Sequence, residues 1–156
     1  MVDHEQIFIG IKDILSRHTT VKIDEVDYGT HLTIEQTGIW MECDRQELTI
    51  GYGLAHVHYD PKYDDLRLAL DRLFNLLTRR KRITLYSKRD QVYKEKTELH
   101  LGDDRFEPLG VAMTWMFPFW QRTTTTVRFE EPLIEYSKIE NDIKDVYKLL
   151  GAGTGR

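Results

Sequence analysis

The chain lacks the features by which several large protein classes are recognised. Its 156 residues contain one cysteine, Cys43, which can form no internal disulfide and therefore predicts a reducing, cytoplasmic location. The most apolar window, residues 111–120, is far shorter than the ~20 residues that a spanning helix needs, and we expect no membrane partner. The first residues, Met1 to Glu5, are acidic and not continuously apolar, which is unlike a secretory signal peptide.

Complete catalytic motifs are also missing from the sequence. Gly51-Tyr52-Gly53 has no third glycine and precedes a predicted strand, which excludes a glycine-rich phosphate loop. No serine or cysteine lies in the context of a nucleophile elbow. The sequence therefore favours a non-enzymatic protein.

Charge argues against nucleic acid as a partner. The formal net charge is −4, whereas nucleic-acid-binding domains are usually basic. The basic run at residues 79–82 follows a predicted helix, where cations stabilise the negative end of the helix dipole. The alternative interpretation is a positive patch that contacts phosphates and also includes Lys88, Arg89, Lys94 and Lys96.

Length and composition predict one small domain. Hydrophobic residues make up 40% and charged residues 31% of the chain, which is ordinary for a globular protein. Residues 1–150 suffice for one hydrophobic core, and we expect them to form a single domain. The glycine-rich residues 151–156 are expected to form a flexible tail.

Three segments repeat apolar residues at the spacing of an amphipathic helix. The first follows Asp3, which with Gln6 is spaced as a capping box. The second is expected to begin at Asp60, an N-cap residue followed by proline, and the third at Ser137. Gly151 is expected to end the third helix. The helices should contribute to a core that contains Ile11, Ile14, Leu66, Leu70, Leu73, Ile143, Val146 and Leu150.

Between the helices the apolar period drops to two, which predicts antiparallel strand pairs. The expected pairs are 21–23 with 32–34, 39–43 with 47–52, 83–86 with 91–99, and 111–117 with 123–129. Residues 102–105 are expected to form a mobile loop. The predicted fold is α+β, with one mostly antiparallel, curved sheet and about three helices packed mainly on one of its faces.

The segment His56-Val57-His58-Tyr59-Asp60 is the first candidate site. On a strand, His56 and His58 point to the same face, and Asp60 follows where the second helix is expected to begin. Two imidazoles and a carboxylate can bind one divalent metal ion. The other interpretation is an exposed polar strip on a sheet, with Asp60 as a helix cap.

This segment resembles the first part of the metal-binding motif of metallo-β-lactamases, which also runs from a strand into a helix. The resemblance covers five residues and implies a divalent metal cofactor. The family's motif continues with a histidine where this chain has Pro61, and His100 is the one obvious further ligand downstream. A metal-dependent enzyme or metal-binding protein is therefore the alternative to a non-enzymatic protein.

The densest aromatic stretch, residues 113–120, is the second candidate site. Phe119 and Trp120 follow Pro118 and should lie at the tip of the last expected hairpin, where aromatic side chains often anchor a partner. Trp115 is the third candidate for partner binding. Core packing is the alternative for these aromatic residues.

The same stretch bears on self-association. Alternation would place Met113, Trp115 and Phe117 on one face of a strand. Residues 123–126 are four threonines, which are typical of an exposed strand at a sheet edge. An open edge beside aromatic side chains favours pairing with a second copy of the chain, and we therefore expect a homodimer.

A broader resemblance covers residues 40–98. It rests on a hairpin that begins with Trp40-Met41-Glu42-Cys43, on the two-histidine segment, on an amphipathic helix, and on the strand Ile83-Thr84-Leu85-Tyr86 before a basic turn. This series resembles small α+β immunity proteins of bacterial polymorphic toxin systems, although the basic turn lacks the glycines of that pattern. The resemblance implies a bacterial, non-enzymatic protein that binds and blocks a toxin without a cofactor.

Overall fold

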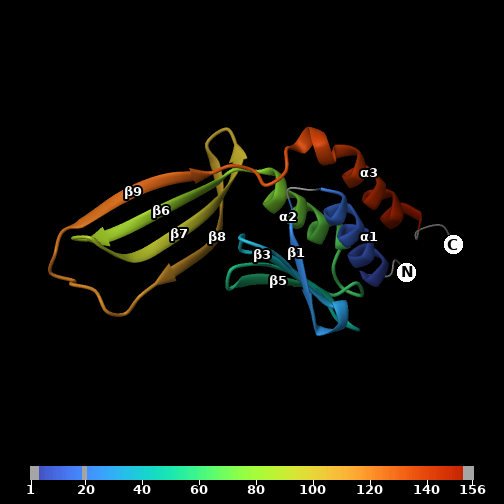
Figure 1. The fold of residues 1–156 in the computed structure, drawn as a ribbon, viewed down its shortest axis with the longest axis horizontal. Coiled ribbons are helices and arrows are strands. Elements are labelled where there is room, and N and C mark those ends of the chain that lie inside the picture. The colour runs from blue at the N-terminus through green and yellow to red at the C-terminus, as the bar shows by residue number, and fades with distance from the viewer. Residues whose placement is uncertain (1–3, 19–20, 153–156) are drawn as a thin grey trace. The chain divides into compact units, whose positions relative to one another are not determined.

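Contacts divide the chain into two compact units, and each contains its own antiparallel sheet (Figure 1). The structure, a computed structural model, describes residues 4–18 and 21–152. Unit 1 comprises the described residues up to Thr78 and from Leu133 onward, and unit 2 comprises residues 79–132. The α+β class is confirmed, whereas two sheets occur where one was predicted. The prediction that residues 1–150 form a single domain stays a prediction, because two compact units can belong to one domain or form two.

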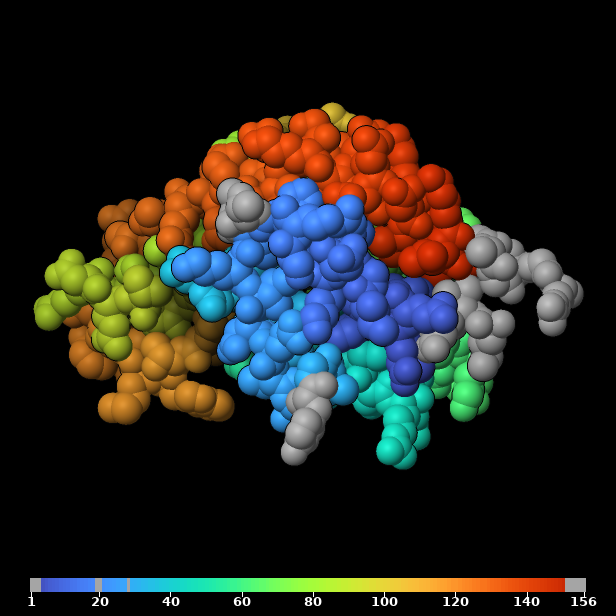
Figure 2. Space-filling view, turned by 45° about the vertical axis from the view of Figure 1, so that its right-hand side comes forward, coloured from blue at the N-terminus to red at the C-terminus, as the bar shows by residue number. Residues whose placement is uncertain are grey.

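Among its described residues, unit 1 contains three α-helices: α1 (His4–Arg17), α2 (Leu66–Thr78) and α3 (Tyr136–Ala152). α1 and α2 pack against the sheet of this unit, and α3 packs against both helices. Figure 2 shows α1 (dark blue) directly beside α3 (red). Each helix buries one apolar stripe, as its period predicts. The eight predicted core residues are all buried: Ile11, Ile14, Leu66, Leu70, Leu73, Ile143, Val146 and Leu150.

The second helix begins later than the sequence predicted. Asp60 caps a separate turn, in which its Oδ1 accepts a hydrogen bond from the backbone N–H of Lys62 at 2.9 Å. The N-cap of α2 is Asp65, whose Oδ1 accepts from the N–H of Arg67 at 2.9 Å. None of residues 61–65 is buried, so core packing does not favour a helix that starts at the proline.

The third helix extends beyond both of its predicted ends. It begins at Tyr136, so Ser137 lies inside the helix rather than at its cap. It also runs through Gly151 to Ala152 and thus includes two residues of the predicted tail. Residues 153–156, like the predicted cap residue Asp3, lie outside the described part of the chain. Helix ends are poorly defined by sequence where no side-chain cap fixes them.

The sheet of unit 1 has the antiparallel strand order β1–β2–β3–β4–β5. Its strands are β1 (Ile23–Val26), β2 (His31–Ile34), β3 (Ile39–Cys43), β4 (Leu48–Tyr52) and β5 (Ala55–Tyr59), and the short 3-10 helix η1 (Asp27–Gly29) joins the first two. Two predicted pairs are confirmed, β1 with β2 and β3 with β4. Buried and more exposed residues alternate along β2 and β3, so one face carries the apolar core and the other is polar.

Unit 2 is built of strands, and its 79–132 segment, described throughout, contains no helix. β6 (Lys81–Lys88), β7 (Gln91–Gly102), β8 (Arg105–Met113) and β9 (Thr123–Glu130) form an antiparallel sheet in the order β8–β7–β6–β9. The predicted pair of residues 83–86 with 91–99 is confirmed as β6 with β7. Residues 102–105, predicted as a mobile loop, form the tight turn of the β7–β8 hairpin, in which Asp103 and Asp104 both have positive φ (49° and 58°).

The last predicted hairpin is wrong. β9 pairs with β6 and lies at the opposite edge of the sheet from β8. Residues 114–122 therefore cross the end of the sheet from one edge to the other. Alternation identifies a strand but not the neighbour with which the strand pairs. The same limit explains why two sheets occur where one was predicted.

Charge is distributed unevenly between the units. Unit 2 has 11 Lys and Arg against 8 Asp and Glu, and the rest of the chain has 11 against 18. The overall charge of −4 thus combines +3 in unit 2 with −7 in the remainder. Unit 2 is therefore the basic part of the chain.

Candidate functional site

The polar face of the unit 1 sheet carries the histidine pair. Its side chains form two rungs across the strands, one of Thr33, Trp40, Gly51 and His56, and one of His31, Glu42, Thr49 and His58. The apolar face of the same strands carries the core of the unit. His56 is exposed, and the side chain of His58 is 53% exposed, so both imidazoles are accessible to a ligand.

His58 is oriented by a carboxylate and a hydroxyl. Its Nδ1 lies 2.5 Å from Oε1 of Glu47 and 3.1 Å from Oγ1 of Thr49. An ionised carboxylate can only accept a hydrogen bond, so Nδ1 of His58 carries a proton and donates it to Glu47. In the neutral ring, Nε2 is then the nitrogen with the free lone pair.

His56 is oriented by the main chain and by an aromatic neighbour. Its Nδ1 lies 3.2 Å from the carbonyl oxygen of Leu54, which can only accept, so Nδ1 is again the protonated nitrogen. The ring centroid of His56 lies 5.7 Å from that of Trp40 and 4.9 Å from that of His58. The planes of the two imidazoles are inclined by 85°, so the rings meet edge to face.

Trp40 lies in the middle of this face. Its Nε1 donates to the carbonyl oxygen of Gly53 at 2.9 Å, and its ring stacks on that of His31 with the centroids 5.5 Å apart. The indole approaches Gly51 so closely that a Cβ there would fall 2.0 Å from Cε2 of the ring. Glycine at position 51 is therefore needed for Trp40 to reach His56.

The structure brings together two of the three residues predicted to bind a metal. His56 and His58 are neighbours on one face, whereas Asp60 accepts a hydrogen bond from the backbone of its own turn. His100, the predicted further ligand, lies on β7, where its ring stacks on that of Phe106 with the centroids 4.9 Å apart. The described residues include no group of three or more His, Cys, Asp and Glu side chains arranged to hold a metal ion.

Sequence reasoning missed two residues of this face, Glu47 and Trp40. The positions of both side chains follow from the alternation of side chains between the two faces of a strand. Leu48 and Met41 are buried core residues, so their immediate neighbours in the chain point to the polar face. The register of three strands then brings these neighbours beside the histidines, and register is what the sequence did not give.

The second candidate site is the loop of residues 114–122 at the end of the unit 2 sheet, hereafter the aromatic loop. Phe117 points inward and stacks on Tyr93 with the ring centroids 4.5 Å apart. Three hydrogen bonds fasten the loop backbone to β6 and β7: Thr114 N–H to the Tyr93 carbonyl (2.8 Å), Gln91 Nε2 to the Met116 carbonyl (2.9 Å) and Lys88 Nζ to the Gln121 carbonyl (2.7 Å). The sheet therefore holds the loop in a defined conformation.

Four large apolar side chains of the aromatic loop are exposed. The exposed fractions are 97% for Trp115, 83% for Met116, 75% for Phe119 and 71% for Trp120. The rings of the last two meet edge to face, with centroids 5.2 Å apart. All three residues predicted to bind a partner thus lie on the surface, so core packing does not explain them.

The alternation predicted through this stretch does not hold. β8 ends at Met113, and beyond it Trp115 is exposed while Phe117 packs on Tyr93. The chain leaves the sheet after Thr114, whose N–H makes the last backbone hydrogen bond to β7. Alternating residues point to opposite faces only within a strand, so the pattern does not predict side-chain direction beyond Met113.

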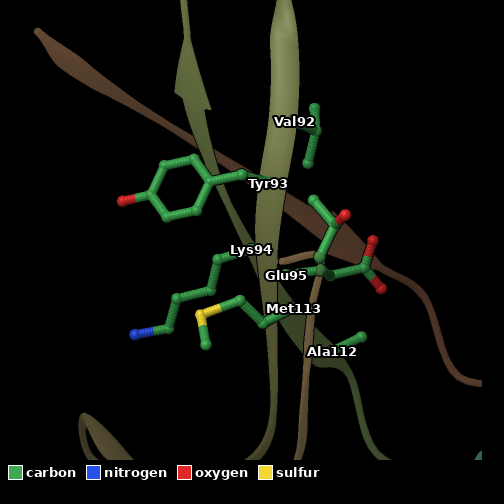
Figure 3. Close-up of a pocket in the computed structure, with 7 residues that line it drawn as sticks. Val92, Tyr93, Lys94, Glu95, Ala112 and Met113 are labelled. Carbon is green, nitrogen blue, oxygen red and sulfur yellow. The ribbon is translucent and has the colours of Figure 1, made fainter. Parts of the chain in front are cut away.

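Two shallow depressions adjoin the aromatic loop. One has a volume of about 480 Å³ and is lined by Gln91, Trp115, Met116, Phe117, Pro118 and Trp120. The other, of about 260 Å³, lies where β7 meets β8 and is lined by residues 92–95 and 112–114. Figure 3 shows Lys94 and Met113 extending side by side from these two strands. Both depressions offer mostly apolar surface.

Glu98 is buried between two cations on the unit 2 sheet. Its Oε2 accepts hydrogen bonds from Nε and Nη2 of Arg82 at 3.0 and 2.7 Å, and its Oε1 lies 2.7 Å from Nζ of Lys96. Burial opposes ionisation, but the hydrogen bonds from Lys96 and Arg82 outweigh it and hold the pKa of Glu98 below its usual value. Arg82 also covers the ring of Phe106, with Cζ 3.5 Å from the centroid. Two cations of the predicted positive patch are therefore engaged within the sheet.

Comparison with known proteins gives no family assignment. No protein-family model matches the chain, and neither a curated protein nor a solved structure gives a significant match. None of the described helices is long and apolar enough to cross a membrane. The geometry of the histidine face and of the aromatic loop is therefore the basis for a functional proposal.

Proposed function

We propose that this chain is a non-enzymatic protein-interaction module that binds its partner through the aromatic loop. One observation carries the proposal: four large apolar side chains in a single short loop are 71–97% exposed. Exposed apolar surface that is concentrated in one place typically marks an interaction site. Tryptophan is also the residue type most enriched where binding energy is concentrated in protein interfaces.

The aromatic loop is suited to binding because its backbone is already ordered. Lys88, Gln91 and Tyr93 hold it through hydrogen bonds, and Phe117 fixes its centre against the sheet. A loop that is ordered before binding loses less conformational entropy when the complex forms. Its outward aromatic rings have few rotatable bonds and large apolar area, so their burial yields more free energy than it costs in entropy.

The surroundings of the loop indicate the chemistry of the partner. Arg89, in the β6–β7 turn, and Arg122, at the end of the loop, are both exposed. Unit 2 has an excess of three positive charges. The partner that fits is a protein with an apolar pocket bordered by acidic residues.

The resemblance of residues 40–98 to bacterial immunity proteins supports a toxin as this partner. The resembling segment includes most of the β6–β7 hairpin, which holds the aromatic loop. We extend the proposal accordingly: the chain acts in the bacterial cytoplasm, where it binds and blocks a toxin that is encoded beside it.

The test is a binding measurement between the purified chain and the candidate toxins encoded next to it. We expect wild type to bind and neutralise one of them, and a Trp115→Ala/Trp120→Ala variant to bind at least about tenfold more weakly, because each buried anchor contributes ~1–3 kcal/mol. The matched control is Leu54→Ala/Tyr63→Ala, which removes two side chains of unit 1 that are 95% and 85% exposed. This control should keep wild-type affinity.

Three outcomes would contradict parts of the proposal. Equal toxin affinity of wild type and the tryptophan variant would show that the aromatic loop is not the binding surface. If no neighbouring toxin is bound or neutralised, the toxin assignment fails. If the loop binds lipid vesicles through Trp115 and Trp120, its role is membrane association, and the interaction-module proposal itself fails.

A further inference from the structure

The two exposed imidazoles of His56 and His58 lie side by side on the polar face, and nothing in the proposed function uses them. The ring centroids of His56 and His58 are 4.9 Å apart and the ring planes are inclined by 85°. Two imidazoles that bind one ion through nitrogens at about 2.0–2.1 Å have ring centroids roughly 5 Å apart. The observed centroid spacing of 4.9 Å matches the spacing that one shared ion requires.

Both imidazoles are also fixed in the tautomer that binding requires. Nδ1 of His58 faces the Glu47 carboxylate, and Nδ1 of His56 faces the Leu54 carbonyl. Both partners are acceptors, so each Nδ1 carries a proton and each Nε2 presents a lone pair. In the described part of the chain, the hydrogen bonds that orient these two rings all involve Nδ1, and the remaining contacts are between aromatic rings.

Glu47 provides a carboxylate that orients His58, which two unrelated surface histidines would lack. A histidine that binds a metal usually donates its other ring N–H to a carboxylate or a backbone carbonyl, which orients the ring and raises its basicity. His58 has the carboxylate and His56 has the carbonyl. Trp40 supports the second ring from the side, and Gly51 makes room for that indole.

We propose that His56 and His58 bind one divalent late transition metal ion through their Nε2 atoms, with Glu47 as a positioning residue. Imidazole favours Cu²⁺, Ni²⁺ and Zn²⁺ over the harder Mg²⁺ and Ca²⁺, and Cu²⁺ should bind most tightly. Two protein ligands leave the remaining coordination positions to water. This proposal is independent of the aromatic loop and of the toxin.

Trp40 provides a direct measurement, because its ring is in contact with His56. The chain has three tryptophans, so Trp115→Phe/Trp120→Phe leaves Trp40 as the only indole. In this background, purified without an affinity tag, Cu²⁺ and Ni²⁺ should quench Trp40 fluorescence to saturation at one equivalent. A chelator should restore the emission, and Mg²⁺ should have no effect.

Substitutions in the same background test the ligands. His56→Ala and His58→Ala should each lower Cu²⁺ affinity at least tenfold, and Glu47→Ala should lower it about tenfold through loss of ring orientation. His31→Ala is the matched control, since His31 stacks on the other side of Trp40 and lies outside the pair. It should keep wild-type affinity. Circular dichroism of each metal-free variant should match wild type, because both ligand histidines are exposed.

Two results would overturn the proposal. The first is quenching that does not saturate, or that persists with unchanged affinity when both His56 and His58 are replaced by alanine. The second is a loss of affinity in His31→Ala as large as that in His56→Ala, which would place the ion elsewhere on the polar face. A pH titration separates Glu47 from a purely structural role: Glu47→Ala should shift the pH midpoint of Cu²⁺ binding, whereas a structural defect would lower thermal stability without that shift.

Discussion

Trp40 lies so close over Gly51 that a Cβ at position 51 would fall 2.0 Å from Cε2 of the indole. The two residues share a rung of the unit 1 sheet, and the same rung ends in His56. Any side chain at position 51 must therefore displace the indole or the strand beneath it. The position of Trp40, and through it that of His56, therefore depends on glycine, which has no side chain, at position 51.

Replacing Gly51 by alanine should destabilise the protein. The new methyl group overlaps the indole, and overpacking of this kind costs about 1–3 kcal/mol in the free energy of unfolding. Urea unfolding followed by circular dichroism gives this value. In the single-tryptophan background, Trp40 emission should also shift as the ring moves toward solvent.

Gly10→Ala is the control for this substitution. A Cβ at position 10 would lie 3.6 Å from Cδ1 of Leu149, which is an ordinary van der Waals contact. Alanine inside α1 should therefore raise the free energy of unfolding by about 0.5–1 kcal/mol, because glycine is a poor helix former. Unchanged stability of Gly51→Ala would contradict the described packing of Trp40.

The start of α2 gives a second prediction. Asp65 caps this helix, whereas Asp60 caps the turn before it. Asp65→Ala should cost about 1 kcal/mol of stability and speed hydrogen exchange at the N–H of Arg67. Asp60→Ala should leave exchange at Arg67 unchanged. Amide exchange measured by NMR distinguishes the two, and faster exchange at Arg67 in Asp60→Ala would contradict the assignment.

Glu98 gives a pH-dependent prediction. Its pKa is lowered in the folded state, so the unfolded chain binds the proton more tightly. The stabilisation is fully present above the unfolded pKa of about 4.3 and is lost as the pH falls through the folded value. Glu98→Gln, which leaves Arg82 and Lys96 without their carboxylate, should cost about 1–3 kcal/mol at neutral pH.

The same substitution should cost less at pH 3, which is below the unfolded pKa, because the unfolded chain then binds a proton at Glu98 and the stabilisation by the ionised carboxylate declines. Urea unfolding of both proteins at pH 7 and pH 3 supplies the comparison. An equal difference in stability at the two pH values would show that charge on Glu98 does not contribute.

The apolar period predicted what depends on local pattern and burial. Eight core residues, three helices and the pairs β1–β2, β3–β4 and β6–β7 were all correct. A stripe such as Leu66, Leu70 and Leu73 identifies its own buried face whatever it packs against. These features therefore needed no knowledge of the rest of the fold.

Features that depend on non-local pairing were not predictable in this way. β9 follows β8 in the chain but pairs with β6, and one predicted sheet became two. The contact between Glu47 and His58 depends on the register of β4 against β5, which a single sequence leaves open. The alternation of side chains along a strand placed His56 and His58 on one face. It could not identify Glu47 and Trp40, which orient their rings.

The last prediction concerns self-association. β9 is at the edge of the unit 2 sheet, all its residues are exposed, and the aromatic loop leads directly into it. An open edge and exposed aromatic rings both favour a second copy of the chain, so we expect a homodimer. Trp120→Ala should weaken this dimer by about 1–3 kcal/mol, which is roughly a tenfold or greater rise in its dissociation constant.

Sedimentation equilibrium across the micromolar range measures the dimer dissociation constants of wild type and of Trp120→Ala. Tyr63→Ala is the matched control, since it removes an aromatic ring of unit 1 that is 85% exposed and should leave the dimer unchanged. Wild-type chain that sediments as an 18.5 kDa monomer at high micromolar concentration would contradict the prediction. The aromatic loop would then serve a foreign partner alone. A dimer that dissociates when the toxin is added would instead show that both partners use the same surface.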